Sequence, residues 1–306
     1  MKQIIIKRLI IGLFVILVVT MLTFALLQLF PGDPAKMIAP WAGEETLIEI
    51  RKSFGLDSPF HIQVLKFYQD ALKGDFGESF FYREEVRTLL FSYFPRTIYL
   101  TLGALLMALV ISIPLGVLSA LNRDSFIDRI VLFISITSQS LPNFWLALMF
   151  ILFFAVKLGL FPAGGYGSWQ HLFLPSFALA CTLIATFIRS IRSMMIDVLE
   201  QDFIKASEAR GIPRLYIIKK GLRNTFVPLL TLFTMQLGYM LGGAVVIEFI
   251  FNYPGIGLLA MQAVLRRDYP LIQGLVVLIS TVFIILNLLV DLSYTYLDPR
   301  IRKEEL

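Results

Sequence analysis

The chain has 306 residues, of which 57% are apolar and only 16% are charged, and its formal net charge is +5 at pH 7. A mean hydropathy of +0.77 is far above that of a soluble globular domain, so the composition predicts a membrane protein. Basic residues are dispersed over the ends of apolar runs, which argues against nucleic acid as a partner. With Cys181 as the only cysteine, an internal disulfide is excluded.

Six runs without charged residues follow one another along the chain and predict an all-α polytopic membrane protein with six transmembrane helices. They cover residues 9–29, 97–121, 130–156, 172–188, 225–247 and 271–290. A helical span needs about 20 residues, with about 17 to 25 tolerated, because every backbone amide must be satisfied within the segment. The run 172–188 is at the short end of that range, whereas 130–156 is long enough to tilt or to extend past the interface.

The distribution of lysine and arginine predicts that both termini are cytoplasmic. With the N-terminus inside, 16 of the 27 basic residues fall in the cytoplasmic pieces, which are 1–8, 122–129, 189–224 and 291–306. The short outside pieces, 157–171 and 248–270, carry only 3. The long outside segment is left out of the comparison, because long segments cross the membrane largely regardless of charge.

Residues 31–96 are the largest part between spans and are expected to be extracytoplasmic, within a chain that forms one membrane domain. Apolar residues at helical spacing predict an amphipathic helix over 60–72, and a second amphipathic piece is expected over 86–94, before Pro95. Between them, 74–77 is a predicted turn. These helices either lie on the membrane surface or the bundle, or dock an external partner, and the two interpretations are compatible.

Polar residues gather in the third and fifth runs. Such groups are unfavourable in hydrocarbon unless they face another helix or a wet cavity. Ordinary hydrogen bonding between helices accounts for each one at least as well as a pathway does, but together they predict a polar seam along a translocation path. The path candidates are Ser135, Ser138, Gln139, Asn143, Thr234, Gln236 and Tyr239.

The sequence lacks the patterns of an enzyme or an ATP-binding protein. His61 and His171 stand apart, no Gly-x-Ser-x-Gly elbow occurs, and no glycine is followed by lysine, so neither a hydrolytic metal site nor a Walker A loop is predicted. We expect no catalytic residue and no bound cofactor. An ion- or proton-coupled carrier acting alone usually needs ionisable or unwound sites near the middle of the membrane. Glu248 and Asp291 are instead expected at span ends within reach of water, which weakens this alternative. An intramembrane enzyme is a weaker alternative still, because no catalytic constellation supports it.

The basic loop 189–224 contains a predicted short amphipathic helix over 197–210. Several of its side chains are small, so another surface can come close. Gly211 is expected to end the helix in the left-handed conformation, with Pro213 beyond it. On these features alone the helix is either a surface connector or a docking element. The docking candidates are Asp202, Phe203, Lys205, Ala206, Ser207, Ala209, Arg210 and Gly211.

At this loop the chain resembles the integral-membrane subunits of ABC importers, whose cytoplasmic loop carries a Glu-Ala-Ala motif followed by a glycine. Aligned on Gly211, that motif falls on residues 205–207, so Ala206 and Gly211 match whereas Lys205 and Ser207 depart. The departures fit the peptide branch of these importers better than the sugar or amino-acid branches.

Further pieces, in order along nearly the whole chain, resemble the B-type permease subunit of dipeptide, oligopeptide, glutathione and nickel importers. The matching pieces are Pro31-Gly32-Asp33-Pro34-Ala35, Gly55-Leu56-Asp57-Ser58-Pro59, Gly74-Asp75-Phe76-Gly77-Glu78-Ser79, Leu222-Arg223-Asn224, Phe251-Asn252-Tyr253-Pro254-Gly255-Ile256-Gly257, Arg267-Asp268-Tyr269-Pro270 and Asp298-Pro299-Arg300-Ile301-Arg302.

The resemblance implies a type I ABC importer permease fold in a bacterial inner membrane, surrounded by lipid. It implies a sister permease, an extracytoplasmic binding protein, and two cytoplasmic ATPases that hold the ATP and Mg. The loop 189–224 would then carry the coupling helix, which is seated on one ATPase. Implied cargoes are dipeptides, oligopeptides, glutathione, or nickel and its chelates, and the lack of a histidine or carboxylate cluster in the spans favours a peptide-like cargo over bare nickel.

Overall fold

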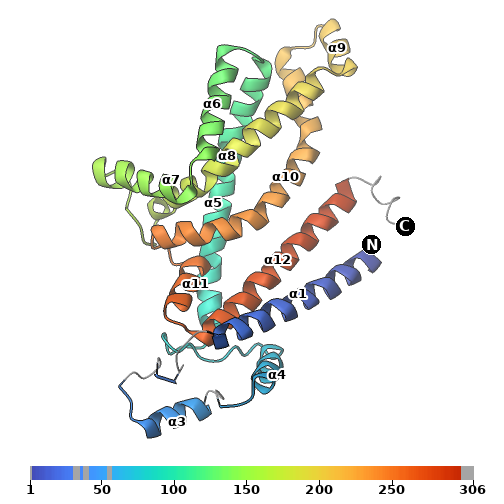
Figure 1. Cartoon of the computed structure of the whole chain (residues 1–306). Coiled ribbons are helices and arrows are strands. Elements are labelled where there is room, and N and C mark those ends of the chain that lie inside the picture. The colour runs from blue at the N-terminus through green and yellow to red at the C-terminus, as the bar shows by residue number, and fades with distance from the viewer. Residues whose placement is uncertain (1, 30–34, 37–40, 54–56, 298–306) are drawn as a thin grey trace. The chain divides into compact units, whose positions relative to one another are not determined.

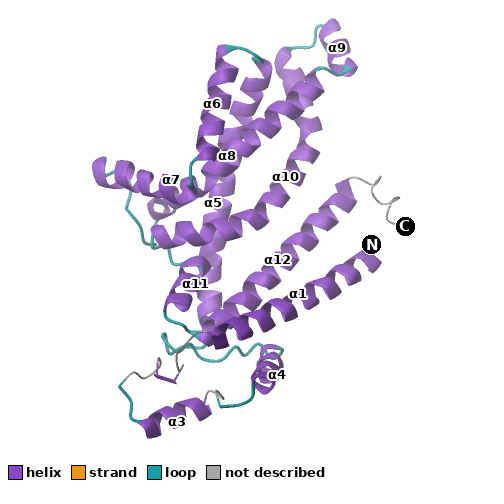
Figure 2. Cartoon of the chain, viewed as in Figure 1, coloured by secondary structure: helices purple, strands orange, loops and turns teal. Residues whose placement is uncertain are grey.

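The computed structural model of the chain describes residues 2–29, 35–36, 41–53 and 57–297. The predicted family pieces at 31–34, 55–56 and 298–302 therefore lie outside the described residues. Within the described ranges the regular structure is helical, apart from one β-bridge between Glu78 and Glu85 (Figure 2). The predicted all-α class is thus confirmed for this part of the chain.

The chain forms two compact units, each made of two separate stretches of the sequence. The first unit comprises residues 1–96 and 255–288, and the second comprises 97–254 and 289–306. Helices of the first unit are α1 (Lys2–Leu29), α3 (Glu44–Ser53), α4 (Phe60–Ala71), the start of α5 (Val86–Leu121), α11 (Ile256–Leu265) and most of α12 (Tyr269–Leu297) (Figure 1).

Helix α4 confirms the predicted amphipathic helix over 60–72. It packs on α1, where the ring of Phe24 meets Phe60 and Phe67 edge to face with centroids 6.5 and 5.3 Å away. The Tyr68 hydroxyl donates a hydrogen bond of 2.9 Å to the carbonyl of Leu17. Packing on a helix that contains a predicted span is one of the two roles expected of this segment, and docking of an external partner stays a prediction.

The second amphipathic piece, predicted to end before Pro95, is instead the first part of α5, which continues to Leu121. A proline inside a helix removes one backbone hydrogen bond. The apolar face of this part is buried in the core of the first unit, and that burial offsets the missing bond. This core consists of Val86, Leu89, Leu90, Ile256, Leu259, Ala263, Leu271 and Leu275.

The second unit is built around α8 (Trp169–Leu199), half of whose length is buried among the other helices. Its core includes Leu100 and Ala104 from α5, Phe187 from α8, and Met240 and Ile247 from α10. The remaining elements of this unit are α6 (Phe126–Ser140), α7 (Asn143–Phe150), the π-helix η1 (Ile151–Lys157), α9 (Asp202–Ala209) and α10 (Arg214–Ile250).

The third predicted run, 130–156, is not one straight helix. It breaks between α6 and α7, and its two parts meet at an angle of 103°. Leu141 has the extended conformation that a following proline favours, with φ −88° and ψ 135°, and Pro142 has no amide proton with which to continue α6. The break therefore follows from the local sequence.

Among the described residues, three helices are long and apolar enough to cross a membrane, over Val86–Leu121, Trp169–Leu199 and Tyr269–Leu289. The bent pair over Phe126–Lys157 makes a fourth if it is a single span. Shorter apolar stretches occur in α1, over Ile10–Leu26, and in α10, over Gly238–Ile250. The predicted count of six spans and the cytoplasmic termini stay predictions.

Candidate functional site

The predicted docking helix is α9, which begins at Asp202 and ends at Ala209 (Figure 1). The prediction over 197–210 also included the last turn of α8, which ends at Leu199. Gln201 precedes α9 in an extended conformation, with φ −70° and ψ 148°, and its carbonyl accepts the amide of Ile204 at 3.0 Å. A separate short helix thus joins the end of α8 to the start of α10.

One face of α9 is anchored to its own unit. The side chains of Ile204 and Ser207 are buried, and Phe203 is half-buried. Lys220 of α10 places its Nζ atom 5.1 Å from the centre of the Phe203 ring. The Ser207 hydroxyl donates to the carbonyl of Phe203 at 2.7 Å. Ser207 therefore lies on the anchored face and does not contribute to the small outer surface expected of it.

The other candidate residues of this segment lie on an exposed face. Ala206 and Ala209 are three positions apart, so they lie on the same side of the helix with little bulk between them and solvent. Lys205 forms an exposed ion pair with Asp202, at 3.5 Å, beside them. The exposed candidates are Asp202, Lys205, Ala206, Ala209, Arg210 and Gly211. This set, with small residues flanked by charges, is called the outer face of α9 below.

Gly211 ends α9 in the left-handed conformation, with φ +72°, which confirms the predicted helix stop. Its amide donates to the carbonyl of Glu208 at 2.9 Å, and the next amide, of Ile212, donates to that of Ser207 at 3.2 Å. A Cβ atom at this position would meet nothing within 4 Å. The backbone therefore favours glycine here, and the space beside it is open to a partner.

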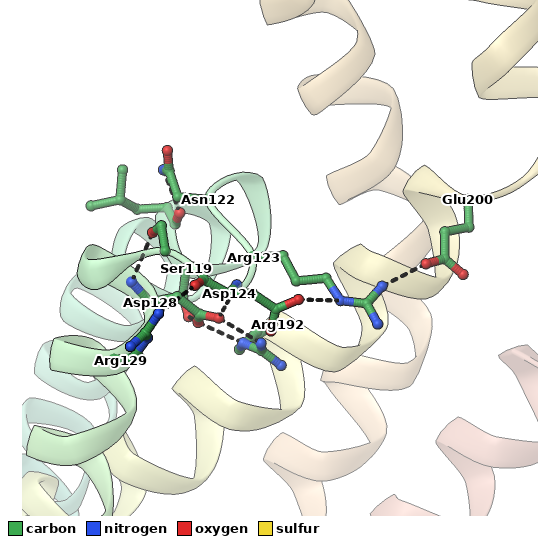
Figure 3. Close-up of polar contacts among 10 residues, drawn as sticks. Ser119, Asn122, Arg123, Asp124, Asp128, Arg129, Arg192 and Glu200 are labelled. Carbon is green, nitrogen blue, oxygen red and sulfur yellow. Dashed lines mark hydrogen bonds and ion pairs between the residues drawn. The ribbon is translucent and has the colours of Figure 1, made fainter.

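A polar network at the end of α8 was not predicted from the sequence (Figure 3). At its centre the buried Asp128 carboxylate accepts two hydrogen bonds from Arg192, at 2.7 and 2.6 Å, and another from the Ser119 hydroxyl. Asp128 and Arg192 are far apart in the sequence, and only their placement in two predicted cytoplasmic pieces, 122–129 and 189–224, indicated that they could meet. These hydrogen bonds hold α6 and α8 together at this point.

The polar candidates of the third run lie against α8 or bond within their own helix. Ser138 donates to the carbonyl of Cys181 at 3.3 Å, and Asn143 accepts from the Thr182 hydroxyl at 2.6 Å. Gln139, which is exposed, accepts from Arg189, whereas Ser135 is buried and bonds to the carbonyl of Val131 at 2.7 Å. The described contacts match ordinary bonding between helices.

The candidates of the fifth run lie in α10. Gln236 is half-buried and Tyr239 is 58% exposed, so both have surface available to solvent or a partner. The side chain of Thr234 lies outside the described part. The described hydrogen bonds of the third-run candidates go to α6 and α8 rather than to these residues, so a seam shared by the two runs stays a prediction.

Glu248 was expected at a span end within reach of water, but its side chain is fully buried. Its carboxylate accepts a hydrogen bond from the Thr97 hydroxyl at 2.7 Å. The prediction was wrong because α10 continues past Glu248 to Ile250, so the carboxylate still faces neighbouring helices. The other span-end carboxylate, at Asp291, has a side chain outside the described part.

Two of the family pieces meet in the first unit. Asp268 stands before α12 and is buried, and its carboxylate accepts hydrogen bonds from the Ser79 hydroxyl at 2.5 Å and from the amides of Phe80 and Phe81 at 3.2 and 3.1 Å. The same carboxylate accepts the amide of Leu271 at 3.3 Å and so caps α12. The pieces at 74–79 and 267–270 thus form one structure, which we call the Asp268 latch.

Comparison with known proteins gives consistent matches over the whole chain. The family model described as the binding-protein-dependent transport system inner membrane component matches residues 112–303. The model for the N-terminal part of such membrane components matches residues 1–101. Both matches are to membrane components of transport systems.

Among curated relatives, a protein of Salmonella paratyphi A named glutathione transport system permease protein GsiC is 37% identical over 304 residues, covering 99% of each chain. The protein of the same name in Escherichia coli K12 is 36% identical with the same coverage. Among solved structures, the fold is similar to a chain of the MetNI methionine ABC transporter in an inward-facing conformation. The TM-score is 0.59 at 20% identity, over 69% of this chain and 96% of that one.

Proposed function

Since the chain belongs to the binding-protein-dependent transport system inner membrane components and is a B-type permease subunit of an ABC importer, we propose that α9 is its coupling helix. The observation that carries this proposal is the contrast between the two faces of α9. One face is anchored by Ile204, Phe203 and Ser207, whereas the outer face presents Ala206 and Ala209 beside the open space at Gly211. A helix of this kind can enter a cleft on another protein.

The anchoring of α9 gives the coupling a physical route. The helix is continuous with the turn at the end of α8 and touches α10 through Phe203 and Lys220. A displacement of α9 therefore moves the ends of two long helices, because a packed core shifts as a body rather than deforming continuously. In this proposal two ATPases bind and hydrolyse ATP with Mg, and their closure displaces α9.

We propose that the chain has six spans with both termini cytoplasmic. The apolar stretches of α1 and α10 supply the two spans beyond α5, the bent pair α6–η1, α8 and α12. Six spans enclose one half of a path, so a sister permease would supply the other half and an extracytoplasmic binding protein would deliver the cargo. The polar residues at Ser138, Gln139 and Gln236 are the proposed contacts of the path.

For the cargo we propose glutathione or a similar short peptide. The relatives that match over the full chain are named for glutathione transport. Within the described residues no group of His, Cys, Asp and Glu side chains comes together as a metal ion would require. A peptide cargo would be bound by groups that pair with amides and carboxylates, whereas bare nickel would need metal ligands.

The test replaces Gly211 by arginine and measures import of labelled glutathione by cells that express the full importer. We expect Gly211→Arg to insert into the membrane normally and to reduce import to the level of cells without the chain, since the arginine fills the space beside the outer face. Import by the unaltered chain tests the cargo in the same experiment.

The matched control is Gly159→Arg. Gly159 also has a left-handed backbone, with φ +60°, and open space at its Cβ position, but it lies between η1 and α8. Both variants therefore carry a similar backbone cost of about 1–2 kcal/mol, and only one of them blocks α9. Normal import by Gly211→Arg, or an equal loss in both variants, would rule out α9 as the coupling helix.

A further inference from the structure

Within the connection between α5 and α6, Arg123 pairs with Asp124 at 3.6 Å. Two further ion pairs of unlike character join this connection to α8 and to the turn after α8 (Figure 3). The first, between Asp128 and Arg192, is buried, and only 2% of the Asp128 side chain is exposed. The second, between Arg123 and Glu200, is on the surface, with 52% and 67% of the two side chains exposed. Neither pair was part of the predicted docking set.

The buried pair acts as a fixed joint. Its carboxylate receives Arg192 from α8 with two parallel hydrogen bonds, the geometry in which arginine and carboxylate bind most strongly. The same carboxylate accepts a hydrogen bond from the Ser119 hydroxyl of α5. It also accepts one, at 2.9 Å, from the amide of Asp124 in the connection between α5 and α6. Three helices thus meet at one charge, which is costly to leave unpaired once it is buried.

The joint also fixes the shape of the connection. Asp124 has a left-handed backbone, with φ +63°, which is uncommon outside glycine and persists where the surroundings hold it. Here its amide is held by Asp128. The result is that the neighbouring residue, Arg123, extends its guanidinium towards the end of α8, where its Nη1 atom lies 2.6 Å from Glu200 Oε1.

Glu200 occupies the turn itself. It follows the last residue of α8 and precedes Gln201, the residue before α9. An exposed ion pair contributes little to stability, so the Arg123–Glu200 contact can open and close at little cost. A displacement of α9 that bends this turn moves Glu200, whereas the fixed joint keeps Arg123 in place.

We propose that Arg123 is a positioning residue for energy coupling, which holds the α8–α9 turn through Glu200 in one conformation of the transport cycle and releases it in the other. This inference rests on the proposed function of α9. A contact made in only one of two conformations biases the equilibrium between them by its own free energy. Loss of the contact therefore changes how much ATP hydrolysis accompanies each transported molecule, without removing the docking surface.

The test measures the ratio of ATP hydrolysed to glutathione imported by the complete importer in proteoliposomes. Arg123→Glu reverses the charge opposite Glu200 and is expected to raise this ratio by about fivefold while the ATPases still co-purify. Arg123→Lys, which keeps the charge, is expected to leave the ratio close to that of the unaltered chain. Arg123→Gln, which only removes the charge, is expected to raise the ratio less. It replaces Arg123→Glu in the test if the charge reversal impairs assembly of the importer.

Two further variants separate this contact from a general effect of charge. Arg129→Glu makes the same change on an exposed arginine nearby, whose described hydrogen bond goes to the carbonyl of Asp124, at 3.3 Å, and should leave the ratio unchanged. Combining Arg123→Glu with Glu200→Arg restores an ion pair of reversed polarity and should restore the ratio. An unchanged ratio in Arg123→Glu, or a raised ratio that the exchanged pair does not restore, would overturn the inference. A complex that never contains an ATPase would instead overturn the proposed function.

Discussion

Asp268 shows how one side chain holds together segments that are far apart in the sequence. Its carboxylate accepts hydrogen bonds from Ser79 and from two consecutive amides while it also caps α12. Beside it, the Arg266 guanidinium lies 3.3 Å above the centre of the Phe81 ring. The Asp268 latch therefore combines polar and cation–π contacts in a buried place, where removing one partner leaves several donors unsatisfied.

We predict that Asp268→Ala frees the segment over 72–85. The loss of a buried acceptor costs about 1–3 kcal/mol, which corresponds to cleavage that is about fivefold to about 150-fold faster when a protease attacks the opened segment. Limited proteolysis of purified protein measures this rate. Glu84→Ala, which removes an exposed carboxylate from the same segment, should leave it unchanged. Equal rates for the two variants would mean that Asp268 does not hold the segment.

At the scale of elements, the connection between η1 and α8 meets the end of α10 through a position that only glycine can fill. A Cβ atom on Gly164 would lie 2.2 Å from the carbonyl oxygen of Phe251. The next amide, of Gly165, donates to that same oxygen at 2.8 Å. Tyr166 then packs edge to face on Tyr253, with ring centroids 5.7 Å apart. This contact fixes the end of α10 within the second unit.

Gly164→Ala is predicted to destabilise the second unit, because the added methyl group meets backbone rather than a movable side chain. Overpacking of this kind costs about 1–3 kcal/mol, which a lower midpoint of thermal unfolding in detergent would reveal. Gly43→Ala provides the control, since a Cβ atom there meets nothing within 4 Å and the backbone is not left-handed. An unfolding midpoint of Gly164→Ala equal to that of the control would show that the two elements do not pack as described.

For the whole molecule, the sequence predicts the fold class and the family because both depend on patterns along the chain. Charge-free runs mark the apolar helices, and the ordered pieces from 74–79 to 267–270 mark the B-type permease. The helix stop at Gly211 is equally local, since it needs only a glycine after small and charged residues. These features were predictable without knowledge of any long-range contact.

Other features depend on which elements meet, and the sequence leaves that open. The anchored face of α9 is set by α8 and α10, so Ser207 turned out to point inward although its size suggested an outer position. Glu248 is buried because α10 extends past it, and Asp128 finds Arg192 only once α6 and α8 pack together. Pro142 accounts for the break in the third run, but the 103° angle of that break depends on the packing of both parts.

Contact between the outer face of α9 and an ATPase can be measured by cross-linking. Ala206→Cys places a thiol on that face, in a chain whose only other cysteine, Cys181, is buried. A photoreactive probe on this thiol, activated in membranes that contain the complete importer, should join the chain covalently to an ATPase subunit. The same probe at Phe126→Cys, at the exposed start of α6, should not. Absence of an adduct from position 206, or equal amounts from both positions, would show that the outer face of α9 does not dock on an ATPase.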